Sequence, residues 1–436
     1  MNAVLPALLL RLHRTLGLLF GPFLLIAALS GALYAMTPQL EAWLYADVLS
    51  ASAEGTPQPL SAQIEAAQAA LKVAAPLAAV RPSPALGQST RVMFKPASAG
   101  ASEHWAVFVD PVSLAIQGQL PVYGTSGVLP LRTQIDLFHR ELLLGSWGRW
   151  YSELAASWLW LVAVGGSLLW LMRPRAKTPH KALRRWHSRV GLVLLVGFLF
   201  FSATGLTWSR FAGENISVLR AQLGMGTPTL ATGLTAQNQA PIDEHHEHNH
   251  HSQPQALAHL PTPMEFEHML HMARGAGLDA DKLEIVASHS PDQAWTINEI
   301  DRSWPTQVDA VAIDAASFRV VDQVHFADFP LAAKLTRWGI DAHMGVLFGL
   351  ANQVLLLIVA LGLASLVVWG YVLAYQKPCP TSLGMLQLWA KLSPTAKVLS
   401  ALLSLAIGFA LPVLGISLLV VLVLDALSHK APQPAH

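Results

Sequence analysis

Cysteine and charge are both scarce in this chain of 436 residues. A single cysteine, Cys379, excludes a disulfide framework, a cysteine-ligated zinc site and a cysteine-ligated iron–sulfur cluster within one chain. Charged residues make up 13% of the sequence, about half of the roughly 25% that is usual in soluble domains. The net charge of +1 argues against a nucleic-acid binder, which needs a strongly basic surface. Because apolar residues reach 53%, the composition favours a membrane protein with sizeable polar segments.

Four apolar runs are long enough to cross a bilayer, which takes about 20 residues. They are residues 16–36, 154–172, 190–208 and 354–374. A fifth run is interrupted by Pro412 and Gly415, and there we expect one kinked helix, with a tight hairpin as the alternative. The first run is too long for the apolar part of an ordinary signal peptide, so we expect an uncleaved anchor.

Basic residues set the expected orientation of these spans. The segment between the second and third runs carries six lysines and arginines and no acid from Arg173 to Arg185, which predicts a cytoplasmic loop. Arg11 and Arg14 place the N-terminus on the same side. The two long polar segments then lie outside, which in a bacterium is the periplasm, and the chain is a multi-pass protein of the bacterial inner membrane. The expected segments are the first span (1–36), the first periplasmic module (37–137), the second span (138–173), a cytoplasmic loop (174–186), the third span (187–208), the second periplasmic module (209–340), the fourth span (341–376), a cytoplasmic loop (377–397) and a C-terminal helix or hairpin (398–428).

The sequence also contains an internal duplication. The first span reads His13-x3-Gly-Leu-x11-Ser-Gly, and the third reads His187-x3-Gly-Leu-x11-Thr-Gly. The strand-like segments 107–116 and 311–320 match, and so do His139 with His343 and Gly166 with Gly370, at one constant offset. Each copy is a span, a polar module and a second span, and both copies enter from the cytoplasm. We therefore expect parallel repeats related by an axis along the membrane normal.

The periodicity within the modules indicates an α+β fold. Segments 62–71 and 265–274 are rich in helix formers, and 105–109 is an apolar strand that ends in an Asp-Pro turn. A hairpin is expected around residues 314–317. The predicted fold class is a mainly α membrane protein with a four-helix core from two parallel repeats, two periplasmic α+β modules and one C-terminal kinked helix or hairpin.

Four histidines lie near the ends of the predicted spans, and the duplication pairs them. His13 and His187 are at the cytoplasmic ends of the first and third spans, whereas His139 and His343 precede the second and fourth on the periplasmic side. Ionisable residues at membrane helices are costly and are functional candidates by default. Residues related by the pseudo-two-fold axis would face each other, which is the arrangement of bis-histidine b-type haem. We predict two haem b groups with these four axial ligands.

Several small and basic residues suit such a site. Room for a macrocycle is expected at Gly17, Gly21, Gly191 and Gly197 near the first pair, and at Gly145 and Gly349 near the second. Contacts to haem propionates are expected from Arg11, Arg14, Arg140 and Arg189, although plain anchoring at the cytoplasmic face explains such arginines equally well. Zinc or copper is the alternative, but two histidines per site leave its coordination short.

The position of the second pair raises a question of geometry. His139 lies 15 residues before Leu154, which is about 22 Å along a straight helix. The second haem would then sit at or above the outer headgroup layer, unless residues 141–151 form an interfacial turn.

A histidine-rich insertion, 243–251, belongs to the second module. Its histidines, His245, His246, His248, His250 and His251, lie among acidic residues, and such tracts bind transition metals loosely. A periplasmic metal catcher and a low-complexity loop with incidental affinity are both open at this point.

The motifs together resemble the PepSY-associated transmembrane helix family. The pieces that carry the resemblance are Leu12-His13-Arg14 with Ser30-Gly31, Phe138-His139-Arg140 with Gly145 and Gly148-Arg149, Arg185-Trp186-His187, and His343 with Gly349 and Asn352-Gln353. Members of that family are iron-regulated inner-membrane proteins, and some are haem-carrying ferric-siderophore reductases. The resemblance implies that His13, His139, His187 and His343 are the haem ligands and that the chain reduces ferric chelates in the periplasm.

No nicotinamide or flavin motif appears in the cytoplasmic segments, so the electrons are expected from a cytoplasmic reductase or a membrane quinol. The expected function is a ferric-siderophore or ferric-chelate reductase. Two other classes remain open at this stage: a haem-free permease for siderophores or metals, and a membrane anchor whose modules bind peptidases.

Overall fold

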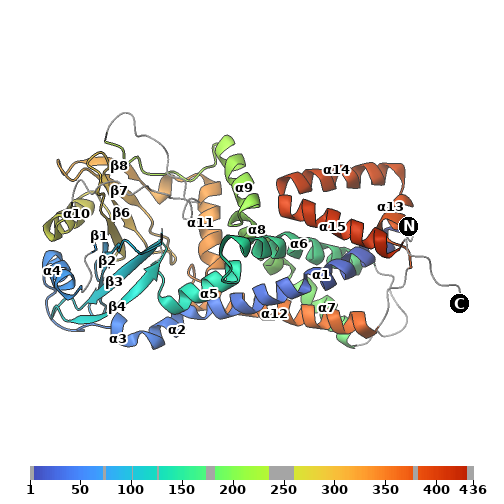
Figure 1. The fold of residues 1–436 in the computed structure, drawn as a ribbon, viewed down its shortest axis with the longest axis horizontal. Coiled ribbons are helices and arrows are strands. Elements are labelled where there is room, and N and C mark those ends of the chain that lie inside the picture. The colour runs from blue at the N-terminus through green and yellow to red at the C-terminus, as the bar shows by residue number, and fades with distance from the viewer. Residues whose placement is uncertain are drawn as a thin grey trace. The chain divides into compact units, whose positions relative to one another are not determined.

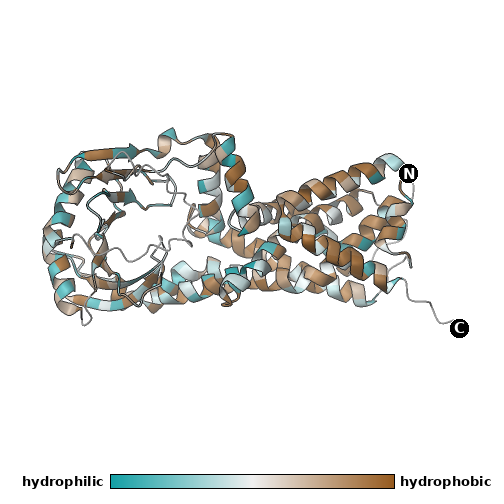
Figure 2. Ribbon diagram, turned by 45° about the horizontal axis from the view of Figure 1, so that its top comes forward, coloured by the Kyte–Doolittle hydropathy of each residue, from teal (hydrophilic) through white to brown (hydrophobic). Residues whose placement is uncertain are grey.

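The computed structural model describes residues 4–71, 75–100, 102–124, 127–172, 182–234, 260–376 and 382–429. The chain forms two compact units (Figure 1). The helical unit comprises Met1–Ala35, Ile135–Gly224 and Leu350–His436, and the sheet unit comprises Met36–Gln134 and Met225–Gly349. In Figure 2 the long helices are dominated by apolar residues, whereas the sheet unit mixes apolar and polar ones.

Among the described residues of the helical unit, three helices are long and apolar enough to cross a membrane. They are α1 (Val4–Ala35), the segment Gly145–Leu171 that contains α6 (Arg149–Leu171), and α12 (Leu350–Gln376). Helices α7 (Ala182–Val193) and α8 (Leu195–Thr207) pass the same test together, with a bend of 57° between them. The chain is a membrane protein with several apolar helices.

The bend falls inside the predicted third span. Glycines at 191 and 197 flank it, and glycine weakens a helix because it adds backbone freedom and no packing side chain. Beyond α8 the chain turns into α9 (Phe211–Gln222).

The chain does not run straight into the second span. Helix α5 (Pro130–Glu141) ends at Glu141, a 3-10 turn covers Gly145–Trp147, and α6 begins at Arg149. Leu142, Leu143 and Gly145 all have positive φ, which breaks the helix. Residues 141–151 therefore do not form a straight helix, and the 22 Å estimate does not apply; the position of this turn at the membrane interface stays a prediction.

The C-terminal segment is a hairpin, so the expectation of one kinked helix is wrong. After α13 (Met385–Ala390), helix α14 (Pro394–Ala410) is followed at once by α15 (Pro412–Ser428), and the two pack against each other. Pro412 starts α15, where a missing amide hydrogen costs nothing. A Cβ on Gly415 would lie 2.8 Å from the Cα of Gly408, so these two glycines let the helices approach closely.

The sheet unit contains one antiparallel sheet of eight strands in the order β4-β3-β2-β1-β5-β6-β7-β8. Its strands are β1 (Leu77–Arg81), β2 (Thr90–Phe94), β3 (Glu103–Val109), β4 (Ile116–Tyr123), β5 (Leu283–Val286), β6 (Trp295–Glu299), β7 (Ala310–Ile313) and β8 (Val320–Val324). The strands of the two predicted modules thus join in a single sheet through β1 and β5, where Val80 pairs with Ile285.

Helices α4 (Leu60–Ala70) and α10 (Pro263–Gly275) pack on one face of this sheet and bury the main apolar cluster, which includes Ile64, Phe266 and Ile285. Helix α10 starts with a capping box between Thr262 and Glu265. Other helices of the unit are α2 (Thr37–Leu44), α3 (Ala46–Leu49), the 3-10 helix Phe326–Asp328 and α11 (Leu331–His343). Both predicted helical stretches, the predicted strand and the predicted hairpin are present.

Candidate functional site

His13 and His187 face each other inside the helical unit. His13 lies on α1 and His187 on α7, and their ring centroids are 6.3 Å apart with an interplanar angle of 79°. The structure therefore brings together the first of the two histidine pairs that the duplication predicts.

Helix α6 holds the ring of His13. The Nδ1 atom lies 3.0 Å from the carbonyl oxygen of Val162. Because a carbonyl only accepts hydrogen bonds, Nδ1 carries the proton and Nε2 keeps its lone pair. One turn further on, a Cβ on Gly166 would lie 2.9 Å from Cε1 of His13, so only glycine lets the ring approach this closely. Val162 and Gly166 thus fix both the tautomer and the position of the ring.

His187 has a similar environment on α12. A Cβ on Gly370 would lie 3.7 Å from Cε1 of His187. The Nδ1 atom of His187 is buried and has no hydrogen-bond partner among the residues that the structure describes. In the duplication, Leu366 is the position that matches Val162, and Gly370 is the position that matches Gly166. Each ring is therefore placed beside a glycine, and the ring of His13 is also held by a carbonyl.

This donor set fits haem better than a bare metal ion. Two metal–nitrogen bonds of about 2 Å in line, with half a ring on each side, separate imidazole centroids by about 6 Å, close to the 6.3 Å found here. Zinc needs three or four protein ligands. In the part of the chain that the structure describes, no group of three His, Cys, Asp or Glu residues is arranged to hold a metal ion. Haem brings its own four equatorial nitrogens and needs only two axial ligands from the protein.

His139 also packs against α1 within the helical unit. Its Nδ1 lies 2.8 Å from the hydroxyl oxygen of Ser30, and a Cβ on Gly31 would lie 3.1 Å from its Cε1. The Ser30 hydroxyl donates its one proton to the carbonyl of Ile26, so it accepts from His139, whose Nε2 keeps the lone pair. His343 ends α11 in the sheet unit. The second pair thus belongs to different units, and its role as a ligand pair stays a prediction.

Arg11 and Arg14 both contact polar groups of other helices. The Nε and Nη2 atoms of Arg11 donate to Oδ1 of Asp425 at 3.1 and 2.9 Å, and Nη2 lies 2.6 Å from His429. Arg11 is thus paired with a buried carboxylate, and its expected contact to a haem propionate stays a prediction. Arg14 donates to the carbonyl of Ala374 at the end of α12, at 2.7 Å.

For Arg140 and Arg189, contact with a haem propionate also stays a prediction. Arg140 lies 3.7 Å from Asp136, one turn earlier on α5. Arg189 is on α7, two residues after His187.

The glycines beside the rings are Gly31, Gly166 and Gly370. Whether the glycines expected near the pairs make room for a macrocycle stays a prediction. Gly21 packs against Tyr371, Gly191 against Leu366 and Gly197 against Val359, and a Cβ on Gly17 would meet nothing within 4 Å. Gly145 and Gly349 have positive φ and serve turns.

Sequence reasoning missed two buried acids in apolar helices. Glu153, on α6, is 1% exposed and accepts from the amides of Phe211 and Ala212 at the start of α9. Asp425, on α15, binds Arg11. A carboxylate inside an apolar run is a visible signal, since burial without a partner is costly. The histidine-rich insertion 243–251 and Cys379 lie outside the described residues.

One protein-family model matches the part of the chain that contains the histidine site. The model of the PepSY-associated TM region matches residues 10–377, which include all four predicted haem ligands. No curated protein matches the chain. The match covers most of the sequence, and the chain therefore belongs to the family of the PepSY-associated TM region.

Proposed function

We propose that the chain is an inner-membrane, b-type di-haem oxidoreductase that reduces ferric siderophores or other ferric chelates in the periplasm for iron acquisition. The observation that carries the proposal is the facing pair His13 and His187, 6.3 Å apart. Haem bound between these imidazoles would supply one-electron transfer. A cytoplasmic reductase or a membrane quinol is the proposed electron donor.

The residues around the pair suit this role. The proton on Nδ1 of His13 is directed at Val162, so Nε2 is free to act as a ligand without losing a proton. An apolar cluster from α1, α6, α8 and α12, which includes Leu24, Leu159 and Phe198, excludes water from the interior of the helical unit.

The finer architecture belongs to the same proposal. We propose two parallel repeats whose polar modules lie in the periplasm. The sheet order supports the duplication, because β4-β3-β2-β1 is followed by β5-β6-β7-β8, so equivalent strands occupy mirrored places on either side of its centre. The turns after β3 and β7 support it as well. Leu114 and Phe318 stand at the duplication offset, and both have positive φ.

The test is a reduced-minus-oxidised optical spectrum of the detergent-purified chain, with the haem-to-protein ratio. We expect a low-spin b-type spectrum and a ratio near two. His13→Ala and His187→Ala should each remove the same haem, whereas His271→Ala, on the exposed side of α10, should remove none. The reduced protein should then be reoxidised by a ferric chelate. A colourless protein from haem-replete cells would refute the proposal and favour the permease or the peptidase-binding anchor.

A further inference from the structure

The C-terminal hairpin lies beyond the region that defines the family, yet it packs directly on the helices of the histidine site. The family match ends at residue 377, and α13, α14 and α15 follow it. Helix α13 contacts α1, and α15 contacts α6. An apolar cluster that includes Leu16, Trp158 and Leu414 fills the space between them.

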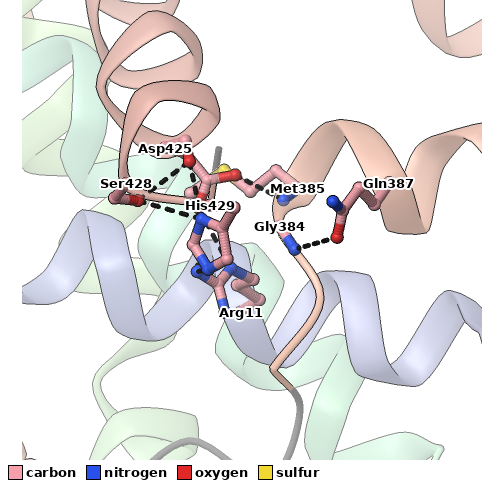
Figure 3. A network of polar contacts seen from close by, with 7 residues as sticks. All are labelled: Arg11, Gly384, Met385, Gln387, Asp425, Ser428 and His429. Atoms are coloured by element: carbon pink, nitrogen blue, oxygen red, sulfur yellow. Dashed lines mark hydrogen bonds and ion pairs between the residues drawn. The ribbon is translucent and has the colours of Figure 1, made fainter. Parts of the chain in front are cut away.

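The first polar link joins α15 to α1 (Figure 3). Asp425 accepts from Nε and Nη2 of Arg11 through Oδ1, and from the amide of Met385 through Oδ2. The side chains of Arg11 and Asp425 are only 12% and 5% exposed. A buried carboxylate without its partner is strongly unfavourable, so this ion pair holds α13 and α15 to one particular turn of α1.

His429 closes the same network. Arg11 only donates hydrogen bonds, so Nε2 of His429 accepts from it at 2.6 Å. The other nitrogen, Nδ1, then carries the proton and donates to the backbone carbonyl of Asp425, also at 2.6 Å. Figure 3 shows the three side chains converging from α1 and the end of α15.

The second polar link joins α15 to α6. The indole nitrogen of Trp158 donates to the hydroxyl of Ser417 at 2.9 Å. Trp158 is 1% exposed and stacks on Phe20 of α1, with ring centroids 4.7 Å apart and an interplanar angle of 9°. Trp158 therefore ties the hairpin, α6 and α1 together.

Both links fall next to the groups that place the ring of His13. Arg11 lies two residues before His13 on α1, and Trp158 lies one turn before Val162 on α6. Val162 is the residue whose carbonyl accepts from Nδ1 of His13. We propose that the C-terminal hairpin is a clamp that holds the His13 ring against α6, with Asp425 and Ser417 as its positioning residues; for its effect on haem, the clamp rests on the function proposed above.

The first test compares Asp425→Asn with a matched control in the full chain. Asn215→Ala removes a hairpin contact at the opposite end, where Asn215 donates to the carbonyl of Ala410. We expect Asp425→Asn to weaken haem binding at the His13 site about tenfold, as is typical when a group that orients a ligand is lost. The midpoint potential of the remaining haem at that site should shift, and Asp425→Glu should restore part of the binding. Asn215→Ala should leave both quantities unchanged.

Ser417→Ala provides a milder second variant. It removes the partner of the Trp158 indole nitrogen and keeps every charge. A clamp predicts a smaller change in the same direction as for Asp425→Asn. Equal haem affinity and potential in wild type, Asp425→Asn and Ser417→Ala would overturn the clamp while leaving the haem function intact.

A readout that needs no haem separates the two proposals. Hydrogen exchange of the full chain in detergent should rise in residues 10–17 of α1 and 158–166 of α6 in Asp425→Asn, and not in Asn215→Ala. A rise confined to α13, α14 and α15 would overturn the clamp. A wild-type chain that binds no haem would refute the proposed function, and the exchange result alone would then decide on the clamp.

Discussion

His13 and His187 face each other across the helical unit with their ring centroids 6.3 Å apart. Each ring is packed beside a glycine, Gly166 for His13 and Gly370 for His187. The two contacts differ in closeness, because a Cβ would meet the first ring at 2.9 Å and the second at 3.7 Å. The site is therefore more tightly constrained on the α6 side than on the α12 side, and this asymmetry is open to a direct test.

Gly166→Ala should displace the His13 ring and reduce haem retention. At 2.9 Å a Cβ is too close to Cε1, so the ring must move away from the carbonyl of Val162. Outer-shell changes of this kind cost about tenfold in affinity or more. Because only one of the two proposed haems binds at the His13 site, we expect the haem-to-protein ratio to fall by about half. Gly165→Ala is the matched control, because its Cβ would meet nothing within 4 Å.

Gly370→Ala completes the series. Its Cβ would make an ordinary contact at 3.7 Å, so haem retention should be unchanged.

Gly165→Ala should also raise stability slightly, because alanine is favoured over glycine in a helix by about 1 kcal/mol. Equal haem ratios in all three variants would contradict the role given to Gly166.

Glu153→Ala should release the start of α9 from α6. The carboxylate accepts two backbone amides, from Phe211 and Ala212, at 3.0 Å each, and it is 1% exposed. Hydrogen bonds to a charged group contribute about 1.5–3 kcal/mol each. Arg210 precedes α9, so limited trypsin digestion should cleave after it faster in the variant. Glu214→Ala, an exposed acid on α9, should keep the wild-type rate.

The C-terminal hairpin should cross the membrane twice. Each of α14 and α15 has 17 residues, or about 25 Å of helix, close to the roughly 30 Å hydrocarbon core. In a Cys379→Ser background, an impermeant thiol reagent should label Lys391→Cys from the cytoplasmic side and Ala410→Cys from the opposite side. Labelling of both cysteines from one side would instead place the hairpin in a single leaflet.

The limits of sequence reasoning are clearest at Arg11 and at the centre of the sheet. The apolar runs predict four spans, of which three are single long helices and the other is the bent pair α7 and α8. The spacing around His13 and His187 predicts the facing pair. Both predictions succeed because span length and motif repetition are local signals. The partner of Arg11 is 414 residues away, so no local pattern assigns it to Asp425. The pairing of β1 with β5 is long-range in the same way. Pro412 fits both a kinked helix and the first turn of a new one, and packing at Gly408 and Gly415 decides between them.

Acid should destabilise the sheet unit through Asp110. Burial alone would raise the pKa of this carboxyl, which is 3% exposed, but hydrogen bonds from the hydroxyl and amide of Ser52 and the amides of Val112 and Ser113 outweigh burial and hold its pKa well below the ordinary value. A carboxyl whose pKa is lower in the folded chain contributes stability above its unfolded pKa of about 3.9 and loses it as the pH falls through the folded pKa.

Asp110→Asn tests this directly in the full chain. The amide group of asparagine faces the donors of Ser52, and a buried donor left without its acceptor costs about 1–3 kcal/mol, so the variant should unfold at a lower temperature near neutral pH. As the pH falls below about 4, the midpoint temperature of unfolding should fall less in the variant than in wild type. The reason is that the variant has no carboxylate at this position to lose its hydrogen bonds on protonation. Asp301 and Asp314 also have lowered pKa values, since hydrogen bonds from Ser303 and Ser317 act against burial, so part of the acid sensitivity should remain. Asp279→Asn, at an exposed position, should follow the wild-type curve, and parallel curves for wild type and Asp110→Asn would show that the carboxylate of Asp110 does not control acid stability.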